Sequence, residues 1–425
     1  MILGMLVLVI TLIIGVPVAF SLGLSSLTIV LMNPSMPINI IAQKTFTGLD
    51  SFPFMAIPFF ILAGELMNSC GITTRLVDFA DSLVGHLKGG LAHINIVSSM
   101  FFAGITGSAV ADTSAIGSIM IPPMTEEGYD VDFSAAVTAA SSVVGPIIPP
   151  SIPMVVFALL SGTSVGGLFL AGIIPGVLLG LGLMIVAYFL SKKYNYGYSQ
   201  KMTPFKEILK ATFKAVIPLL MPIIILGGIL SGVFTATEAS AIAVVYSLII
   251  GFFVYRSLSV KDLPSIFVET AKTTAMVFLV IGTANIFNFI LGSEQIPQTI
   301  AEFFTSNIDS RLVFLLIINI ILLIIGTFIE GTAAMILTVP VLLPTVLQFG
   351  IDPIMFGAIV VLNLMIGLIT PPLGLCLFVA SGVAKISLER IAKAVIPFLA
   401  IEIVVLLLTT YIEPITMFLP KLFGY

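Results

Sequence analysis

Two short stretches of the sequence, Gly145–Ser151 and Gly367–Leu373, have residue types suited to binding a cation inside a membrane. They read Gly-Pro-Ile-Ile-Pro-Pro-Ser and Gly-Leu-Ile-Thr-Pro-Pro-Leu. Each proline lacks a backbone N–H and disturbs the preceding helical turn, so carbonyl oxygens are left without helical partners. In hydrocarbon such carbonyls are costly unless something binds them, and sodium prefers oxygen ligands. We therefore expect paired sodium sites here, with a hydroxyl ligand from Thr370; proline kinks satisfied by neighbouring helices are the alternative.

Two further segments, Gly104–Asp112 and Gly326–Ala334, are rich in glycine, hydroxyl groups and acids. If two half-length helices meet at each, positive N-terminal helix ends would attract an anion near mid-membrane. Hydroxyl-bearing residues that only pack helices closely are the alternative. The residues that we assign to substrate binding are Thr106, Ser108, Ser151, Glu330 and Thr332.

The remaining acids have simpler interpretations. Asp112 and Glu330 are the only acids at hairpin depth; we expect Asp112 to hold the tip structurally and Glu330 to belong to the site. Glu238, in Thr235-Ala-Thr-Glu, matches a capping box that opens a helix. Glu65 is expected to pack against a basic neighbour.

We identify no set of residues in this sequence that would catalyse a reaction. Cys70 and Cys376 are far apart, and His86 and His93 lack the spacing of a metal pair. We find no nucleophile–base pair, no metal cluster and no phosphate-binding loop. The sequence therefore predicts a protein that is not an enzyme, with no catalytic residues and no metal other than sodium.

The composition is that of a membrane protein. Hydrophobic residues make up 59% of the 425 positions and charged residues only 9%, against about 25% charged in soluble domains. A helix needs roughly 20 apolar residues to cross a bilayer. We expect spans at residues 2–32, 52–69, 133–162, 163–191, 216–233, 236–255, 265–292, 354–384 and 394–419.

Two apolar segments, 89–125 and 311–348, do not fit simple crossings because their centres are polar or Gly-rich. We interpret both as re-entrant helical hairpins, and 133–162 and 354–384 as broken helices. The expected organisation is N-terminal scaffold helices at 1–72, a first repeat core at 73–192, a cytoplasmic connector at 193–215, scaffold helices at 216–310, a second repeat core at 311–393 and a C-terminal helix at 394–425.

An internal repeat relates the two cores. A shift of 222 positions aligns Gly104 with Gly326, Gly145 with Gly367, and the two Pro-Pro pairs with each other. Matches at glycine and proline indicate shared backbone geometry. Five crossings separate the two hairpins, so the copies have opposite orientations. Inverted repeats with broken helices are typical of secondary transporters; a structural duplication without transport is the alternative.

The basic residues divide unequally between the two faces. Of 17 Lys and Arg residues, 14 fall on one side and only Lys44, Arg311 and Lys421 on the other. The positive-inside rule makes the first side cytoplasmic, and with residues 1–32 as one retained helix the N-terminus is cytoplasmic too. The segment Lys192–Lys214 is interpreted either as partly an amphipathic surface helix or as a solvated linker.

The glycine, proline and hairpin motifs of this sequence resemble those of the large membrane subunit, the DctM-type or M subunit, of tripartite ATP-independent periplasmic (TRAP) transporters. The resemblance covers essentially the whole chain. It is carried by the stretches Ile57–Glu65, Val84–Leu91, Gly107–Asp112, Gly145–Pro153 and Phe234–Ala239.

The resemblance implies an all-α polytopic fold of the elevator type in a bacterial inner membrane. It implies sodium-coupled symport of an organic acid anion, such as a dicarboxylate, a sugar acid or sialic acid. It implies two partners, a small DctQ-type membrane subunit and a DctP-type periplasmic substrate-binding protein. One sodium ion would lie among Gly104, Gly145, Ile148 and Pro150, and the other among Gly326, Gly367, Thr370 and Leu373.

One departure from the family concerns the second tip. Many members carry Asp-Met-Thr-Pro there, whereas this chain has Glu330-Gly-Thr-Ala. The competing functions are another ion-coupled transporter, a primary pump with a separate ATPase, a membrane enzyme and a passive channel.

Overall fold

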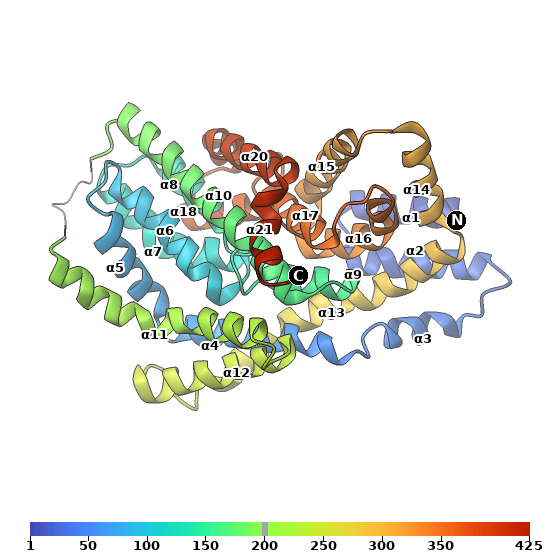
Figure 1. The fold of residues 1–425 in the computed structure, drawn as a ribbon, viewed down its shortest axis with the longest axis horizontal. Helices are drawn as coiled ribbons and strands as arrows, with labels where there is room; N and C mark the ends of the chain where they lie inside the picture. Colours follow the sequence, from blue (N-terminus) through green and yellow to red (C-terminus); the bar gives the residue numbers. More distant parts are fainter. Residues whose placement is uncertain (198–202) are drawn as a thin grey trace.

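The computed structural model describes residues 1–197 and 203–425, and every regular element in these two ranges is a helix (Figure 1). Seven of the described helices are long and apolar enough to cross a membrane. The count rises to eight if the bent pair α19 (Leu388–Ala394) and α20 (Ile396–Tyr411) is one span. The expected all-α polytopic fold class is confirmed.

The first 32 residues do not form the single crossing that we expected. They form two helices, α1 (Ile2–Ile13) and α2 (Val18–Met32), which pack antiparallel. Ser25 Oγ donates a 2.8 Å hydrogen bond to the carbonyl of Gly4, near the other end of the pair. At 1.5 Å per residue these helices are about 18 and 22 Å long, too short to cross about 30 Å of hydrocarbon.

This helical pair removes the reason for placing the N-terminus on the basic face. Because α2 runs back alongside α1, Met1 and Asn33 lie at the same end of the pair. Figure 1 shows the N-terminus at the right-hand end, beside α14 (Ile296–Asn307). The basic end of α10 and the start of α11 lie at the opposite end.

The two cores repeat the same order of elements: a short helix, two hairpin arms, a broken helix and a long helix. In the first core these are α5 (Ile72–Val84), α6 (Gly90–Thr106), α7 (Ala109–Glu126), α8 (Val131–Ser142), α9 (Ile152–Ser161) and α10 (Val165–Lys193). In the second they are α14, α15 (Arg311–Phe328), α16 (Gly331–Gln348), α17 (Pro353–Gly367), α18 (Leu375–Ala384), and the pair α19 and α20.

The 222-position shift holds at the level of whole helices. It carries α7, residues 109–126, onto residues 331–348, which are the bounds of α16. The two cores also exchange contacts: α7 packs on α18, and α16 packs on α9. The second arm of each hairpin therefore lies against the second half of the other core's broken helix, which brings both tips and both breaks into one region.

A second group of helices flanks this region. The 3-10 turn η1 (Phe52–Met55) leads into α4 (Ala56–Ser69), and α12 (Ala236–Ile249) packs on α4 before continuing as the π-helical turn η2 (Ile250–Val254). The 31-residue α13 (Leu263–Ser293) contacts α2, α4 and the hairpin arm α16, as well as α3 (Asn39–Thr47). The predicted capping box of α12 is confirmed, because Thr235 N donates to Glu238 Oε2 at 2.8 Å.

The ends of two other expected segments differ from prediction. α11 (Phe205–Leu230) is one continuous helix, so the second half of the expected connector belongs to a long helix rather than to a separate surface helix. Lys201 lies outside the described residues. The last expected span ends earlier, because α20 stops at Tyr411 and a short helix, α21 (Glu413–Leu422), follows.

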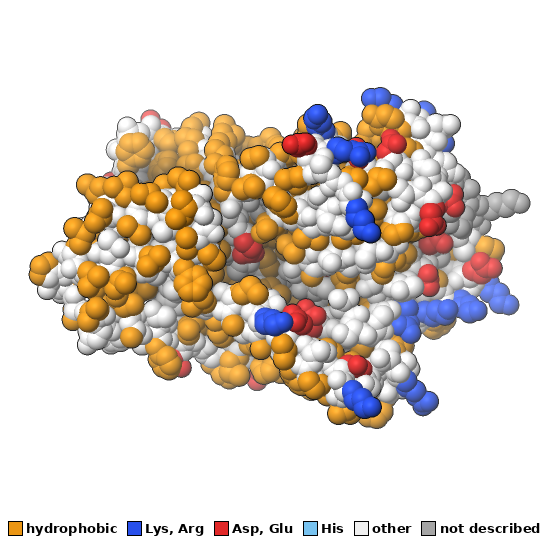
Figure 2. All heavy atoms as spheres, turned by 180° about the vertical axis from the view of Figure 1, so that it is seen from behind, with side chains coloured by type: hydrophobic (Ala, Val, Ile, Leu, Met, Phe, Trp, Pro, Cys, Tyr) orange, Lys and Arg blue, Asp and Glu red, His pale blue; other side chains and the backbone are white. Residues whose placement is uncertain are grey.

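Charge and apolar surface are separated along the molecule. Figure 2 shows the face of the molecule opposite to that of Figure 1. On this face most Lys and Arg side chains lie toward the right, while hydrophobic side chains cover the left. The interior between the helices is mostly apolar, and some of its buried polar groups are paired. Asn319 Nδ2 donates to Thr410 Oγ1 at 3.0 Å, and Asn363 Nδ2 donates to Asn319 Oδ1 at 2.8 Å.

Candidate functional site

The first hairpin turns at Gly107 and Ser108. Gly107 has φ of 60°, the left-handed region that glycine adopts without a steric penalty. Ser108 then caps α7, with its Oγ accepting a 3.4 Å hydrogen bond from Ala111 N. The tip therefore presents the N-terminal end of α7 with a neutral cap.

The second hairpin turns at Ile329 and Glu330. Glu330 is the N-cap of α16, and its Oε2 accepts a 3.0 Å hydrogen bond from Ala333 N. A carboxylate at a helix N-terminus offsets the positive end of the helix dipole. The two tips thus occupy equivalent positions in the repeat but differ in charge.

The first break lies between α8 and α9, from Val143 to Ser151. Ser151 caps α9 by accepting from Met154 N at 3.2 Å, and its hydroxyl donates to the Pro146 carbonyl. No described backbone N–H donates to the carbonyls of Ile148 or Pro149. The break therefore leaves oxygens available to a ligand, as the proline content predicts.

The second break lies between α17 and α18, from Leu368 to Gly374. The Leu368 carbonyl accepts from Cys376 N at 3.0 Å. Thr370 Oγ1 donates to the Ile366 carbonyl at 2.9 Å, so its proton points into the helix and its lone pairs remain available. Both breaks contain a cis bond between their two prolines, Pro149–Pro150 and Pro371–Pro372.

The first predicted sodium set lies together around the first break. A methyl group added to Gly104 would lie 3.3 Å from the Pro149 carbonyl oxygen, so the hairpin arm α6 touches the diproline backbone. At the tip, a methyl group on Gly107 would lie 3.2 Å from the Pro150 carbonyl oxygen. Gly145 is buried against Asp112, and Ile148 is half-buried with its side chain packed on Gly176 of α10.

The second predicted set is assembled by direct backbone contact. A methyl group on Gly367 would lie 2.7 Å from the Cα of Gly326, which leaves no room for a side chain between α15 and α17. Thr370 follows within the same turn of the break. The Leu373 side chain is 41% exposed and lines a cavity of about 580 Å³ beside Glu330 and residues 15–18.

A cavity of about 670 Å³ lies between the two cores and α13. Four helices of the two cores begin at its wall, α7, α9, α16 and α18, which contribute Ala109, Ile152, Thr332 and Leu375 to the lining, and α2 begins there too, at Val18. Of the residues that we assigned to a substrate, Ser108, Glu330 and Thr332 line this cavity. Among its described lining residues, Glu330 is the one charged group, and there is no Lys or Arg.

A smaller cavity of about 420 Å³ shares Ser108, Ile152 and Thr273 with the first. Thr106 lines it, with its hydroxyl donating to Asp112 Oδ1. Glu65 lines it too, whereas we expected this acid to pair with a basic neighbour; it takes part in none of the described salt bridges. Ser151 is only 1% exposed and lines neither cavity.

Two groups of lining residues have no sequence signal. Thr273 is one of six hydroxyl-bearing residues in α13, and nothing in the sequence distinguishes it from the other five. Residues 17–20, at the turn between α1 and α2, reach the same cavity because those two helices are short. Only the packing of α2 against α13 places them there.

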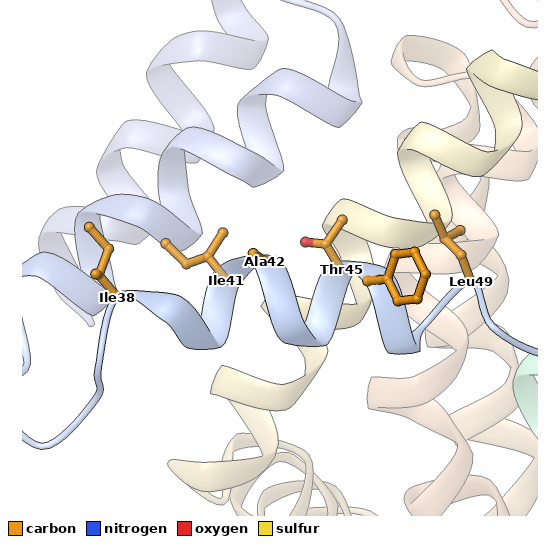
Figure 3. A pocket seen from close by; sticks show the side chains of 6 residues that line it. Ile38, Ile41, Ala42, Thr45 and Leu49 are labelled. Atoms are coloured by element: carbon orange, nitrogen blue, oxygen red, sulfur yellow. The ribbon is translucent and has the colours of Figure 1, made fainter.

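An apolar groove of about 580 Å³ lies elsewhere, along one face of α3 (Figure 3). Its lining includes Ile38, Ile41, Phe46 and Leu49, with Thr45 as its only polar residue. None of these residues belongs to a tip or a break, so the groove is separate from the site.

The chain is similar to several known transporter proteins. The model of the tripartite ATP-independent periplasmic transporter DctM component matches residues 5–415. The isethionate TRAP transporter permease protein DctMQ of Oleidesulfovibrio alaskensis is 47% identical over 407 residues, which are 96% of this chain and 64% of that protein. This chain therefore spans about two thirds of that relative's length.

Two relatives have the length of this chain. The sialic acid TRAP transporter large permease protein SiaM of Vibrio cholerae is 44% identical, with 97% of this chain and 96% of that protein covered. The C4-dicarboxylate TRAP transporter large permease protein DctM of Pseudomonas aeruginosa is 43% identical, with 95% and 94% covered. The crystal structure of the Alcanivorax borkumensis YdaH transporter has the same fold, with a TM-score of 0.63 at 14% identity over 91% of this chain and 88% of that one.

Proposed function

The chain belongs to the DctM component family of tripartite ATP-independent periplasmic transporters, and from this premise we propose that it imports an organic acid anion by sodium-coupled symport. A periplasmic substrate-binding protein would deliver the anion, and a small membrane subunit would brace the complex in the bacterial inner membrane. Alternating access would be of the elevator type. In this topology Met1 lies on the face that carries residues 33–51, which is the periplasmic face.

The observation that carries this proposal is the convergence of four helix N-termini from the two cores on one cavity, whose described lining residues include no Lys or Arg. A helix N-terminus has N–H groups without intrahelical partners and carries about half a positive charge, which the Glu330 carboxylate offsets at α16 only. Such ends bind anions without a Lys or Arg. The lining therefore suits a carboxylate or sulfonate held by backbone dipoles and hydroxyls.

The difference between the tips suggests how an anion lies in the cavity. Ser108 caps α7 without a charge, and Asp112 in the first turn of α7 is fully buried and lines neither of the two cavities, whereas the Glu330 carboxylate caps α16 and lines the larger cavity. We place the anionic group at the α7 tip and hydrogen-bond donors of the substrate near Glu330. A second carboxylate there would face Glu330 without a basic partner, so a hydroxylated monoanion, such as a sugar acid, fits better than a dicarboxylate.

Sodium would supply the charge that the cavity lacks. Both breaks contain carbonyl oxygens to which no described backbone N–H donates, and Thr370 adds a hydroxyl whose proton is already donated. A cation and an anion bound next to each other each strengthen the binding of the other, because opposite charges attract strongly where water is excluded. This mutual attraction is the physical basis for coupling in our proposal.

An elevator motion is supported by the division of the helices. The tips and breaks of both cores pack on one another and would move as one body, carrying the cavity's inner wall. α13 supplies the opposite wall, with Thr273 and Val277, and would remain with the scaffold. The short helices α5 and α14, equivalent in the repeat, connect each core to that scaffold.

The test is uptake into proteoliposomes that contain this chain, its small membrane partner and the binding protein. We expect that uptake of a labelled hydroxylated monoanion requires an inward sodium gradient and does not require ATP. Uptake that follows the sodium gradient equally well after ATP removal excludes a primary pump. Uptake that requires ATP, or that proceeds without sodium, would overturn the proposal; the first result would favour a pump with a separate ATPase.

A further inference from the structure

We propose that the carboxylate of Asp112 is a direct ligand of the cation at the first break, so that the two cation sites of this chain differ in charge. The inference rests on the proposed sodium coupling and deepens it. Asp112 lies in the first turn of α7, four residues after the tip residue Ser108. We had expected it to hold the tip structurally, and its surroundings account for only one of its two oxygens.

The carboxylate is fully buried, with an exposed fraction of 0%. Oδ1 accepts a hydrogen bond from the Thr106 hydroxyl, whereas Oδ2 has no hydrogen-bond partner in the described structure. Asp112 takes part in none of the described salt bridges. Burial of a carboxylate without a compensating charge is very unfavourable, so this group requires either a cation or a bound proton.

The free oxygen points at the first break. A methyl group added to Gly145 would collide with Asp112 Oδ2 and would lie 3.1 Å from the Ser142 carbonyl oxygen. The carboxylate thus occupies the space that any side chain at Gly145 would need. The same break has the free carbonyls of Ile148 and Pro149, and Pro149 touches α6 at Gly104. The first break therefore has a carboxylate oxygen against Gly145 and two free carbonyl oxygens three and four residues further along the chain.

The repeat supplies a comparison within the chain. The 222-position shift carries Asp112 onto Ala334, Thr106 onto Phe328 and Ile148 onto Thr370. The first break accordingly has a carboxylate where the second has a methyl group, and the second has a hydroxyl where the first has an apolar side chain. If Asp112 served only to hold a tip, the second tip would need an equivalent, but Glu330 caps α16 from a different position.

The charge difference has a functional consequence. A cation at the first site would be neutralised by Asp112, so this site would fill at a lower sodium concentration than the second. The cation at the second site, surrounded by neutral oxygens, would then offset the charge of the substrate. Binding would be ordered. The first cation would bind at the first break before substrate, and the second cation and the anion would then bind together.

The test is equilibrium binding of radioactive sodium to the purified complex of this chain with its membrane partner, before any transport is measured. For the native chain we expect two classes of site. In Asp112→Asn, which keeps the shape and the acceptor for Thr106, the tighter class should weaken at least tenfold while the weaker class stays unchanged. Sodium-dependent protection against thermal unfolding gives a second readout and shows whether the variant is folded.

A second variant keeps the test decisive if Asp112→Asn does not fold. Gly145→Ala retains every charge but displaces Oδ2, and it should weaken the same class of site. The matched control is Gly382→Ala in α18, where an added methyl group meets nothing within 4 Å; it should bind sodium as the native chain does.

The outcomes separate this inference from the proposed function. Two classes of site that are unchanged in Asp112→Asn would overturn the role of Asp112 and leave sodium coupling intact. Failure of the native complex to bind sodium at all would overturn the proposed coupling itself. Loss of one class in both variants, but not in the control, would support the inference.

Discussion

Gly326 of α15 and Gly367 of α17 touch backbone to backbone, because a Cβ on Gly367 would lie 2.7 Å from the Gly326 Cα. Two segments 41 positions apart in the chain, as their numbers show, meet here at the end of a hairpin arm and the start of a helix break. The contact sets how closely the second hairpin approaches the second break. It is therefore a sensitive point for stability and for the proposed second cation site.

Gly367→Ala should separate these two helices. The added methyl group has no space, because its neighbours are backbone atoms that cannot rotate away, and overpacking of this kind costs about 1–3 kcal/mol. We expect a lower thermal unfolding temperature and weaker sodium activation of uptake. Gly227→Ala in α11, where an added methyl group meets nothing, is the control and should behave as the native chain. Equal behaviour of the two variants would contradict the packing argument.

Thr370→Val should weaken sodium activation without loss of folding. The substitution preserves the shape and removes one hydroxyl that donates to the Ile366 carbonyl at 2.9 Å. We expect the sodium concentration for half-maximal uptake to rise by about tenfold, which corresponds to about 1.4 kcal/mol of lost interaction. The measurement is uptake against sodium concentration in proteoliposomes.

Thr338→Val is the matched control for this prediction. Its hydroxyl donates to the Ala334 carbonyl at 2.8 Å in the same geometry, but it lines none of the cavities described above. Its sodium dependence should equal that of the native chain. If both threonine variants shift alike, the effect belongs to the helix hydrogen bond and not to a cation ligand.

Glu330→Gln should change the preference among anions. The amide oxygen still accepts from Ala333 N, so the cap on α16 remains while the negative charge in the cavity disappears. We expect dicarboxylates to compete better with a labelled hydroxylated monoanion, with a change in the competition ratio of about tenfold or more. Competition assays at fixed sodium measure this ratio, and an unchanged ratio would remove Glu330 from our account of selectivity.

Tyr196→Phe tests a contact outside the membrane segments. The Tyr196 hydroxyl donates to Asp130 Oδ2 at 2.6 Å, and its ring stacks on Tyr129 and packs at a tilt against Phe133. Loss of this hydrogen bond should cost about 1 kcal/mol. Burial, and then the hydrogen bond to Asp130, raise the pKa of Tyr196 above its ordinary value of 10.0.

The raised pKa of Tyr196 predicts the pH dependence. Below pH 10 the tyrosine is neutral in both the folded and the unfolded state, so its stabilising contribution is complete. As the pH rises above 10 the unfolded chain ionises first, and the contribution is lost. The difference in unfolding temperature between the native chain and Tyr196→Phe should therefore shrink above pH 10; a difference that grows there would contradict the assignment.

The sequence by itself determined the features that depend on local chemistry. Low charge and long apolar runs required a membrane fold, and glycine and proline at a fixed offset revealed the repeat. The Pro-Pro pairs located both breaks, because a missing N–H interrupts a helix in any surroundings. The capping box at Thr235 is equally local, and it was predicted correctly.

Only the tertiary structure decided the features that depend on which helices meet. Residues 2–32 have enough apolar residues for one span, but the chain turns at Gly15 and Pro17, and α2 folds back on α1 to form a pair too short to cross. Thr273 lines the cavity because α13 faces both tips, and Ser151 does not because its hydroxyl is bonded within the break. Asp112 is the clearest case. The sequence places it near a tip, but only the packing of α7 against the first break brings its free oxygen to Gly145. Local spacing in the sequence does not show which distant segments will come into contact.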